Sequence, residues 1–135
     1  MSPPEIETIE SNGQILAVVI RQSYLPSQTS FLTPKEFNQQ VGFIVYSRGS
    51  TIRRHRHTMQ ERRIVGTTEV IWIKRGHCRL DVFDDREIAV KQIDLRTGDL
   101  VILVAGGHGF EVEEDTVLVE VKQGPFSPTE DKVFF

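Results

Sequence analysis

The chain has 135 residues, of which 39% are hydrophobic and 26% charged, so its composition predicts one globular domain with a proper core. The formal net charge of −3 argues against nucleic acid as a partner, although residues 48–63 are locally basic. The single cysteine, Cys78, excludes an internal disulfide and favours a reducing compartment. Neither a signal peptide nor an apolar stretch of bilayer length is visible, so we expect a cytoplasmic protein without a membrane partner.

Residues 1–40 are expected to form an N-terminal arm, one strand and a short helical turn. Residues 1–12 are polar and contain two prolines, which predicts a loose arm. Asn12-Gly13 predicts a turn, and residues 14–21 (QILAVVIR) are typical of a strand because Val and Ile favour extended backbone.

A helix start is predicted at Thr33. The threonine at the cap position, Pro34 at the first helical position and Glu36 three residues after the cap match the capping-box pattern. The pattern predicts one helical turn near residues 35–38, and no other helix is expected.

Residues 41–122 consist of short strand-like segments separated by turn residues. The segments are residues 41–48, 51–57, 69–74, 77–83, 87–95, 100–104, 109–113 and 116–122. No helical period competes with their period of two. Strands this short and evenly spaced indicate an all-β sandwich or barrel.

The alternation of side chains along these segments predicts which residues face the core. Glu69 shares a face with Ile71, and His108 lies on the apolar face of its segment, so both are expected to point inward. His55 and His57 also share one face of their segment. If the strands curl together, these three imidazoles and one carboxylate can meet around a divalent metal ion.

In the last segment, the alternation separates valines from charged residues. Val117, Val119 and Val121 are expected on the core face. Glu120 and Lys122 are expected on the opposite face.

Residues 123–135 form a C-terminal tail in this interpretation. The tail ends in Val133-Phe134-Phe135, and three apolar residues at a terminus rarely stay solvated. We therefore expect these residues to dock on the barrel or on a second subunit.

The chain resembles the cupin superfamily, whose members are small double-stranded β-helix, or jelly-roll, barrels. The first cupin motif is matched by Gly49, His55, His57, Glu69 and Gly76. The second is matched by Gly98-Asp99, the apolar residues 100–103 and the turn that leads to His108. The resemblance covers residues 41–122 and implies a single jelly-roll barrel, hence one domain for the whole chain.

The resemblance also implies a divalent transition metal inside the barrel, held by His55, His57, Glu69 and His108. Iron, manganese, nickel, cobalt and zinc all suit such ligands, and the sequence does not choose among them. The link from His57 to Glu69 is longer than the family pattern, so Glu61 is an alternative carboxylate ligand. Glu69 is preferred because it opens a strand with a defined inward face.

Two further residues are candidate contacts for a bound ligand. Arg53 shares the face of His55, so its guanidinium can hold a carboxylate or phosphate at the barrel mouth, unless it is a solvated surface charge. Tyr46 can line the ligand pocket or pack between sheets.

The resemblance implies a homodimeric metalloprotein with a small-molecule ligand and, if it is an enzyme, an oxygenase or isomerase that acts on a small acid or sugar. One alternative is a metal-free sugar-nucleotide isomerase or epimerase of polysaccharide biosynthesis, in which His55 or His57 is the general base and Arg53 grips phosphate. The other is a non-catalytic ligand-binding or sensor cupin, since a fold does not fix a function.

Overall fold

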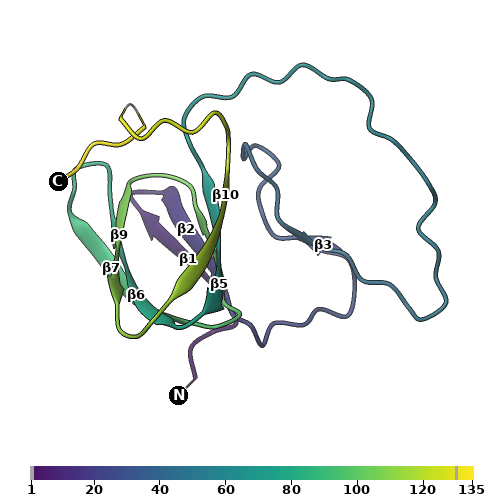
Figure 1. The fold of residues 1–135 in the computed structure, drawn as a ribbon, viewed down its shortest axis with the longest axis horizontal. Coiled ribbons are helices and arrows are strands. Elements are labelled where there is room, and N and C mark those ends of the chain that lie inside the picture. Colours follow the sequence, from purple (N-terminus) through teal and green to yellow (C-terminus); the bar gives the residue numbers. More distant parts are fainter. Residues whose placement is uncertain (1, 130) are drawn as a thin grey trace. The chain divides into compact units, whose positions relative to one another are not determined.

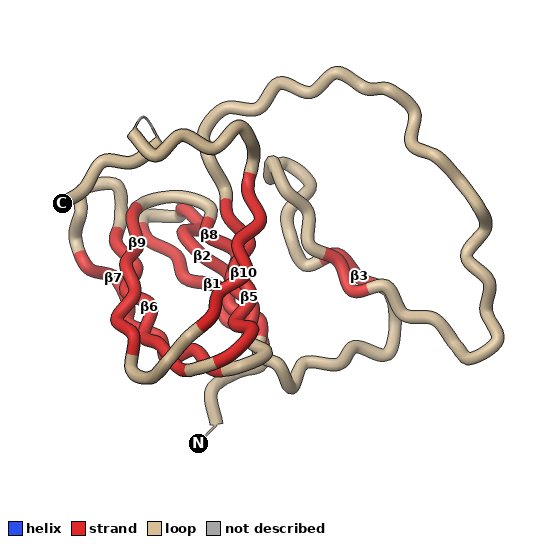
Figure 2. The backbone as a smooth tube through the Cα atoms, in the orientation of Figure 1, coloured by secondary structure: helices blue, strands red, loops and turns tan. Residues whose placement is uncertain are grey.

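Antiparallel β-strands make up all the regular secondary structure of the computed structural model, which describes residues 2–129 and 131–135. Ten strands and no helix lie in these residues (Figure 2), so the all-β prediction is confirmed. Accordingly, that part of the chain contains no helix long and apolar enough to cross a membrane. The strands belong to two units, which we call the sandwich unit (Met1–Tyr24 with Thr67–Phe135) and the loop unit (Leu25–Gly66).

The sandwich unit consists of two antiparallel sheets that face each other (Figure 1). The larger sheet has the order β1 (Ile6–Ser11), β2 (Gln14–Ile20), β8 (Leu100–Leu103), β5 (Glu69–Arg75) and β10 (Val117–Lys122). The smaller sheet has the order β7 (Ala89–Arg96), β6 (His77–Phe83) and β9 (Gly107–Val112). The strands described here form separate sheets and no closed barrel, an arrangement consistent with a β-sandwich, and the predicted jelly-roll barrel stays a prediction.

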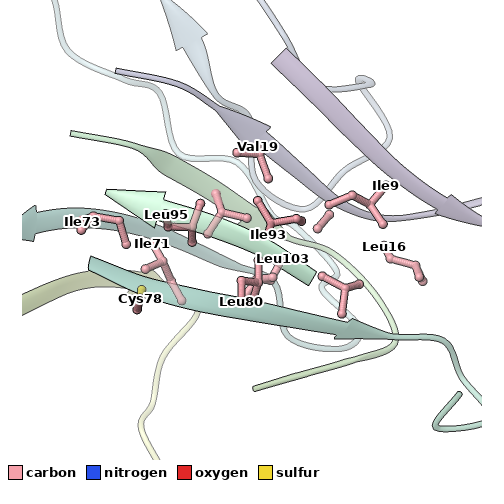
Figure 3. Close-up of a cluster of buried hydrophobic side chains, with 13 residues drawn as sticks. Ile9, Leu16, Val19, Ile71, Ile73, Cys78, Leu80, Ile93, Leu95 and Leu103 are labelled. Carbon is pink, nitrogen blue, oxygen red and sulfur yellow. The ribbon is translucent and has the colours of Figure 1, made fainter. Parts of the chain in front are cut away.

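Alternating side chains from both sheets fill the space between them (Figure 3). On β6, Cys78, Leu80 and Val82 are at most 1% exposed, as their alternation predicts, whereas the residues between them are partly exposed. Leu16 of β2 and Leu95 of β7 are equally buried. Burial of a leucine or valine side chain stabilises a fold by about 1.5–3 kcal/mol, so this core is the main source of the unit's stability.

Strand β1 occupies the segment that the sequence predicts as a loose arm. That prediction for residues 1–12 is wrong, because six of them pair with β2. Asn12 and Gly13 take positive φ angles of 52° and 75°, the backbone of a type I′ hairpin turn. A turn of this type joins two antiparallel strands. The Asn-Gly pair in the sequence therefore indicates that a strand, β1, precedes it. Ile9, 3% exposed, anchors the strand in the core.

Strand β10 has the opposite phase from the prediction. Val117, Val119 and Val121 are 41%, 38% and 54% exposed, so the expectation that they face the core is wrong. The pairing of β10 with β5 sets the phase. Lys122 lies opposite Glu69, which points inward, and a period of two then turns the valines outward.

The loop unit contains two short strands, β3 (Ser30–Phe31) and β4 (Gly42–Phe43), which pair antiparallel. The predicted strand over residues 41–48 is therefore limited to two residues. The predicted strand over residues 51–57 is wrong, because these residues are exposed and lack regular secondary structure. Their alternation is one of arginine and histidine, so neither face of the segment has an apolar surface to bury.

The predicted helical turn near residues 35–38 is a single turn rather than a helix. The Phe37 N–H donates to the Pro34 carbonyl at 3.1 Å, and the next residues do not continue the pattern. The Thr33 hydroxyl, predicted to cap a helix, accepts a hydrogen bond from the Val41 N–H at 3.1 Å instead. The side chain thus closes a loop, which is the other common use of threonine beside a turn.

Candidate functional site

Glu69, the first residue of β5, points into the sandwich. It is 8% exposed and shares its face with Ile71 (2%) and Ile73 (0%), which confirms the predicted inward orientation. Burial in an apolar site disfavours the charged form of a carboxylate. A glutamate at this position therefore needs a cation or hydrogen-bond donors nearby.

His108 of β9 supplies that partner from the opposite sheet. Its Nε2 atom lies 3.4 Å from Oε1 of Glu69, and the two side chains are 31% and 11% exposed. The hydrogen bond from His108 lowers the pKa of Glu69 to about 2, against the opposing effect of burial. Glu69 is therefore a carboxylate at every physiological pH. The His108 residue is exposed, although the alternation of its strand predicts an inward, buried position, and its imidazole reaches Glu69 from the smaller sheet.

Glu120 and Lys122 of β10 complete the charged cluster, although the alternation of this segment predicts both on the face away from the core. The hydrogen bond with Glu69 raises the pKa of Glu120, because two neighbouring carboxyl groups resist ionising together. Lys122 Nζ lies 3.6 Å from Glu120 Oε2, and the lysine side chain is only 11% exposed. The pairing register of β10 with β5 is what identifies them, because it places both residues beside the inward-facing residues of β5.

The charged cluster borders a cavity of about 430 Å³ between the sheets. The apolar wall is formed by Ile71, Phe110 and Leu118. The polar groups come from Glu69, His108, Glu120 and Lys132. A concave apolar site of this size with a few convergent polar groups is typical of small-molecule binding.

The C-terminal tail lies along this cavity. Figure 1 shows it passing from the end of β10 toward the smaller sheet. The Phe135 ring packs edge-on against Phe83, with 5.2 Å between the ring centroids, but Phe135 is still 61% exposed, so the predicted docking is limited to this one contact. Val133 and Phe134 stay 86% and 87% exposed, although Phe134 borders the cavity.

His55 and His57 lie in the loop unit, on an exposed segment without regular secondary structure. Their ring centroids are 5.4 Å apart. His55 Nδ1 lies 2.8 Å from the carbonyl oxygen of Arg53, which accepts hydrogen bonds only, so Nδ1 is the donor in this contact. A ring oriented through Nδ1 in this way leaves Nε2 as the nitrogen through which His55 would bind a metal.

The remaining candidates, Arg53, Tyr46 and Glu61, are exposed residues of the loop unit. The Tyr46 side chain is 54% exposed. Neither Arg53 nor Glu61 forms an ion pair with a residue that the structure describes. Their roles as a ligand contact and as an alternative carboxylate stay predictions.

The structure thus brings Glu69 and His108 together in one unit, and His55 and His57 together in the other. Within residues 2–129 and 131–135, no group of three or more His, Cys, Asp or Glu side chains is arranged to hold a metal ion. The four-residue metal site therefore stays a prediction.

Comparisons of the chain with protein-family models, with curated protein sequences and with solved structures give no significant match. The cupin resemblance is accordingly a prediction that depends on the motif residues of this chain.

Proposed function

We propose that the chain is a cupin-like metalloprotein that binds a divalent transition metal and a small oxygen-bearing ligand. The proposed metal ligands are His55, His57, Glu69 and His108, and the proposed metal is iron, manganese, nickel, cobalt or zinc. The observation that carries the proposal is the contact between Glu69 and His108, because it joins two of the four motif residues at the edge of a cavity.

The Glu69–His108 pair has the chemistry of half a metal site. Glu69 is ionised because its pKa is about 2, and an imidazole nitrogen directed at it can exchange a proton for a metal ion. A bound first-row metal would supply Lewis-acid polarisation of an oxygen atom in the ligand. Electrostatic interactions beside the apolar wall of the cavity are stronger than in bulk water.

The strand topology supports the jelly-roll component of the proposal. From β5 to β10 the chain passes between the two sheets, with β5, β8 and β10 in the larger sheet and β6, β7 and β9 in the smaller. Cupins are double-sheet jelly rolls, in which the strands also divide between two facing sheets.

The test is the metal content of protein purified without a histidine tag, measured by plasma mass spectrometry. We expect about one transition metal per chain in the wild type. Losses of at least about tenfold are expected in His55→Ala, His57→Ala, Glu69→Ala and His108→Ala. Glu61→Ala is the matched control and should keep its metal. A wild type that stays metal-free after reconstitution with iron, manganese, nickel and zinc contradicts the proposal.

A metal-free acid–base function is the second candidate, and the same contact favours it. A carboxylate 3.4 Å from an imidazole nitrogen orients the ring, as a general base in an isomerase or epimerase requires. His108 would then remove the substrate proton, with Glu69 as its positioning residue. Turnover of a sugar nucleotide by metal-free wild type, with loss of turnover in His108→Ala, would separate this function from the first.

A further inference from the structure

One charged residue of the cavity has no counterion among the residues that the structure describes. Lys132 lines the cavity together with Glu69 and His108. It forms no ion pair with any residue in the described part of the chain. Lys132 is exposed, and its ammonium group is therefore accessible to a charged ligand that enters the cavity.

The acidic side chains around Lys132 already have partners. The carboxylate of Glu69 has an imidazole 3.4 Å away. Lys122 Nζ lies 3.6 Å from Glu120 Oε2 and 3.5 Å from Asp131 Oδ2, so a single buried lysine serves both of these groups. The acidic side chains of the cluster are therefore paired with His108 and Lys122, and not with Lys132.

Contacts on both sides of Lys132 hold its backbone at the cavity. On one side, the Thr67 hydroxyl donates to Oδ1 of Asp131 at 3.1 Å. On the other side, the Phe135 ring packs on Phe83 at 5.2 Å between centroids. These two contacts tie the segment on either side of Lys132 to the sandwich unit, while Lys132 itself is exposed.

Gly107 of β9 makes room for the aromatic anchor. A Cβ atom at this position would lie 2.7 Å from the ring of Phe135, which is closer than real side chains approach. An alanine at this residue would therefore displace the ring and loosen the segment that carries Lys132. The substitution changes no charge, so it separates the position of the lysine from its chemistry.

We infer that Lys132 is the anion-binding residue of the cavity, and that the ligand is a small oxyanion, either an organic acid or a phosphate ester, whose charged oxygens pair with this ammonium group. An ammonium group beside an apolar wall forms strong charge-assisted hydrogen bonds with such an anion. This oxyanion would be the ligand of the proposed function. The assignment of Lys132 rests on the proposed function only for the place of the ligand, the Glu69–His108 cavity. It does not require the metal.

The experiment is titration calorimetry of the full chain with oxalate, with inorganic phosphate and with the neutral analogue oxamide, on both metal-free and zinc-loaded protein. We expect Lys132→Met to weaken binding of the anion about tenfold. Lys132→Arg keeps the charge, and Lys74→Met removes an exposed lysine of β5 as the matched control. Both should change the affinity less than about twofold. Gly107→Ala should weaken it about threefold, since the lysine stays but loses its anchor.

The outcomes divide clearly. Binding of oxalate alone identifies a carboxylate ligand and binding of phosphate alone a phosphate ester, and either supports the inference. Equal anion affinities in Lys132→Met and Lys74→Met overturn it, as does a wild type that binds neither anion or binds oxamide as tightly as oxalate. A lysine effect in the metal-free arm, together with a wild type that stays metal-free after reconstitution with iron, manganese, nickel and zinc, contradicts the metal proposal and leaves the inference intact.

Discussion

In the sandwich unit, side chains such as Ile73 and Leu80 are completely buried. In the loop unit, every residue of which the structure describes, Thr33 is the one buried residue. The charges differ as well. Seven basic and two acidic residues give the loop unit a formal charge of +5, and nine basic and seventeen acidic residues give the sandwich unit −8. Every ion pair between described residues lies within the sandwich unit.

The two units differ in how much burial stabilises them. The sandwich buries enough apolar surface to offset the conformational entropy of an ordered chain, and it can hold Glu69 and His108 in a fixed geometry. The loop unit has little burial of that kind, so its backbone is expected to open at low free-energy cost. In the proposed function, this unit contributes two side chains, His55 and His57.

The largest expected difference is between apolar substitutions in the two units. Leu80→Ala removes a fully buried side chain and should lower the free energy of unfolding by about 2–5 kcal/mol. Ile52→Ala removes a side chain that is 58% exposed and should change this free energy by less than about 0.5 kcal/mol. Urea unfolding followed by the fluorescence of Trp72 measures both. Equal losses would mean that residues 25–66 belong to the same cooperative core.

A second difference between the two units is expected in how their glutamates affect the free energy of unfolding at low pH. The folded pKa of Glu69, about 2, lies below the ordinary 4.5, so its ionised form stabilises the fold above pH 4.5 and that contribution is lost as the pH falls toward 2. The linked free energy is on the order of 3 kcal/mol. The raised pKa of Glu120 acts in the opposite sense, lowering stability as the pH rises above 4.5.

The measurement is the urea midpoint as a function of pH. Glu69→Gln should remove the part of the acid loss that falls between pH 4.5 and pH 2. Glu61→Gln replaces an exposed glutamate of the loop unit and should reproduce the wild-type profile. If Glu69→Gln also follows the wild-type profile, the paired carboxylate does not stabilise the fold.

The strands of the sandwich unit could be predicted wherever one face of a segment is apolar and meets the core. β6 has the predicted bounds, and β5 differs from its prediction by one residue. The phase of β10 could not be predicted in this way, because its charged face meets the cavity and its valines face outward. A hydrophobic pattern identifies the inward face only where the space inside is itself apolar, and a polar site reverses the rule.

The candidate site could be predicted in part, for a related reason. The inward orientation of Glu69 follows from the alternation of its own strand, whereas His108 reaches it from an exposed position. The place of Lys132 could not be predicted, because it depends on the path of the tail, which is fixed by contacts with Thr67 and Phe83 far away in the sequence. No periodicity of the tail carries that information.

The smallest expected difference concerns backbone strain at two matched glycines. Gly13 and Gly49 have φ angles of 75° and 86°, and a Cβ atom at either residue would meet nothing within 4 Å. An alanine at either position therefore has the same local cost, about 1 kcal/mol, from the left-handed backbone alone. At Gly13 this cost should appear in full in the free energy of unfolding, because the β1–β2 hairpin pairs along the larger sheet.

At Gly49 the same strain should stay local. The turn there is closed by the hydrogen bond from the Ser50 N–H to the Ser47 carbonyl at 3.1 Å, in a segment that is exposed throughout, so it can relax without unfolding the core. We therefore expect the urea midpoint of Gly49→Ala to match the wild type while that of Gly13→Ala falls. Equal shifts would mean that the loop unit unfolds together with the sandwich, and the two units would then differ in sequence and charge but not in stability.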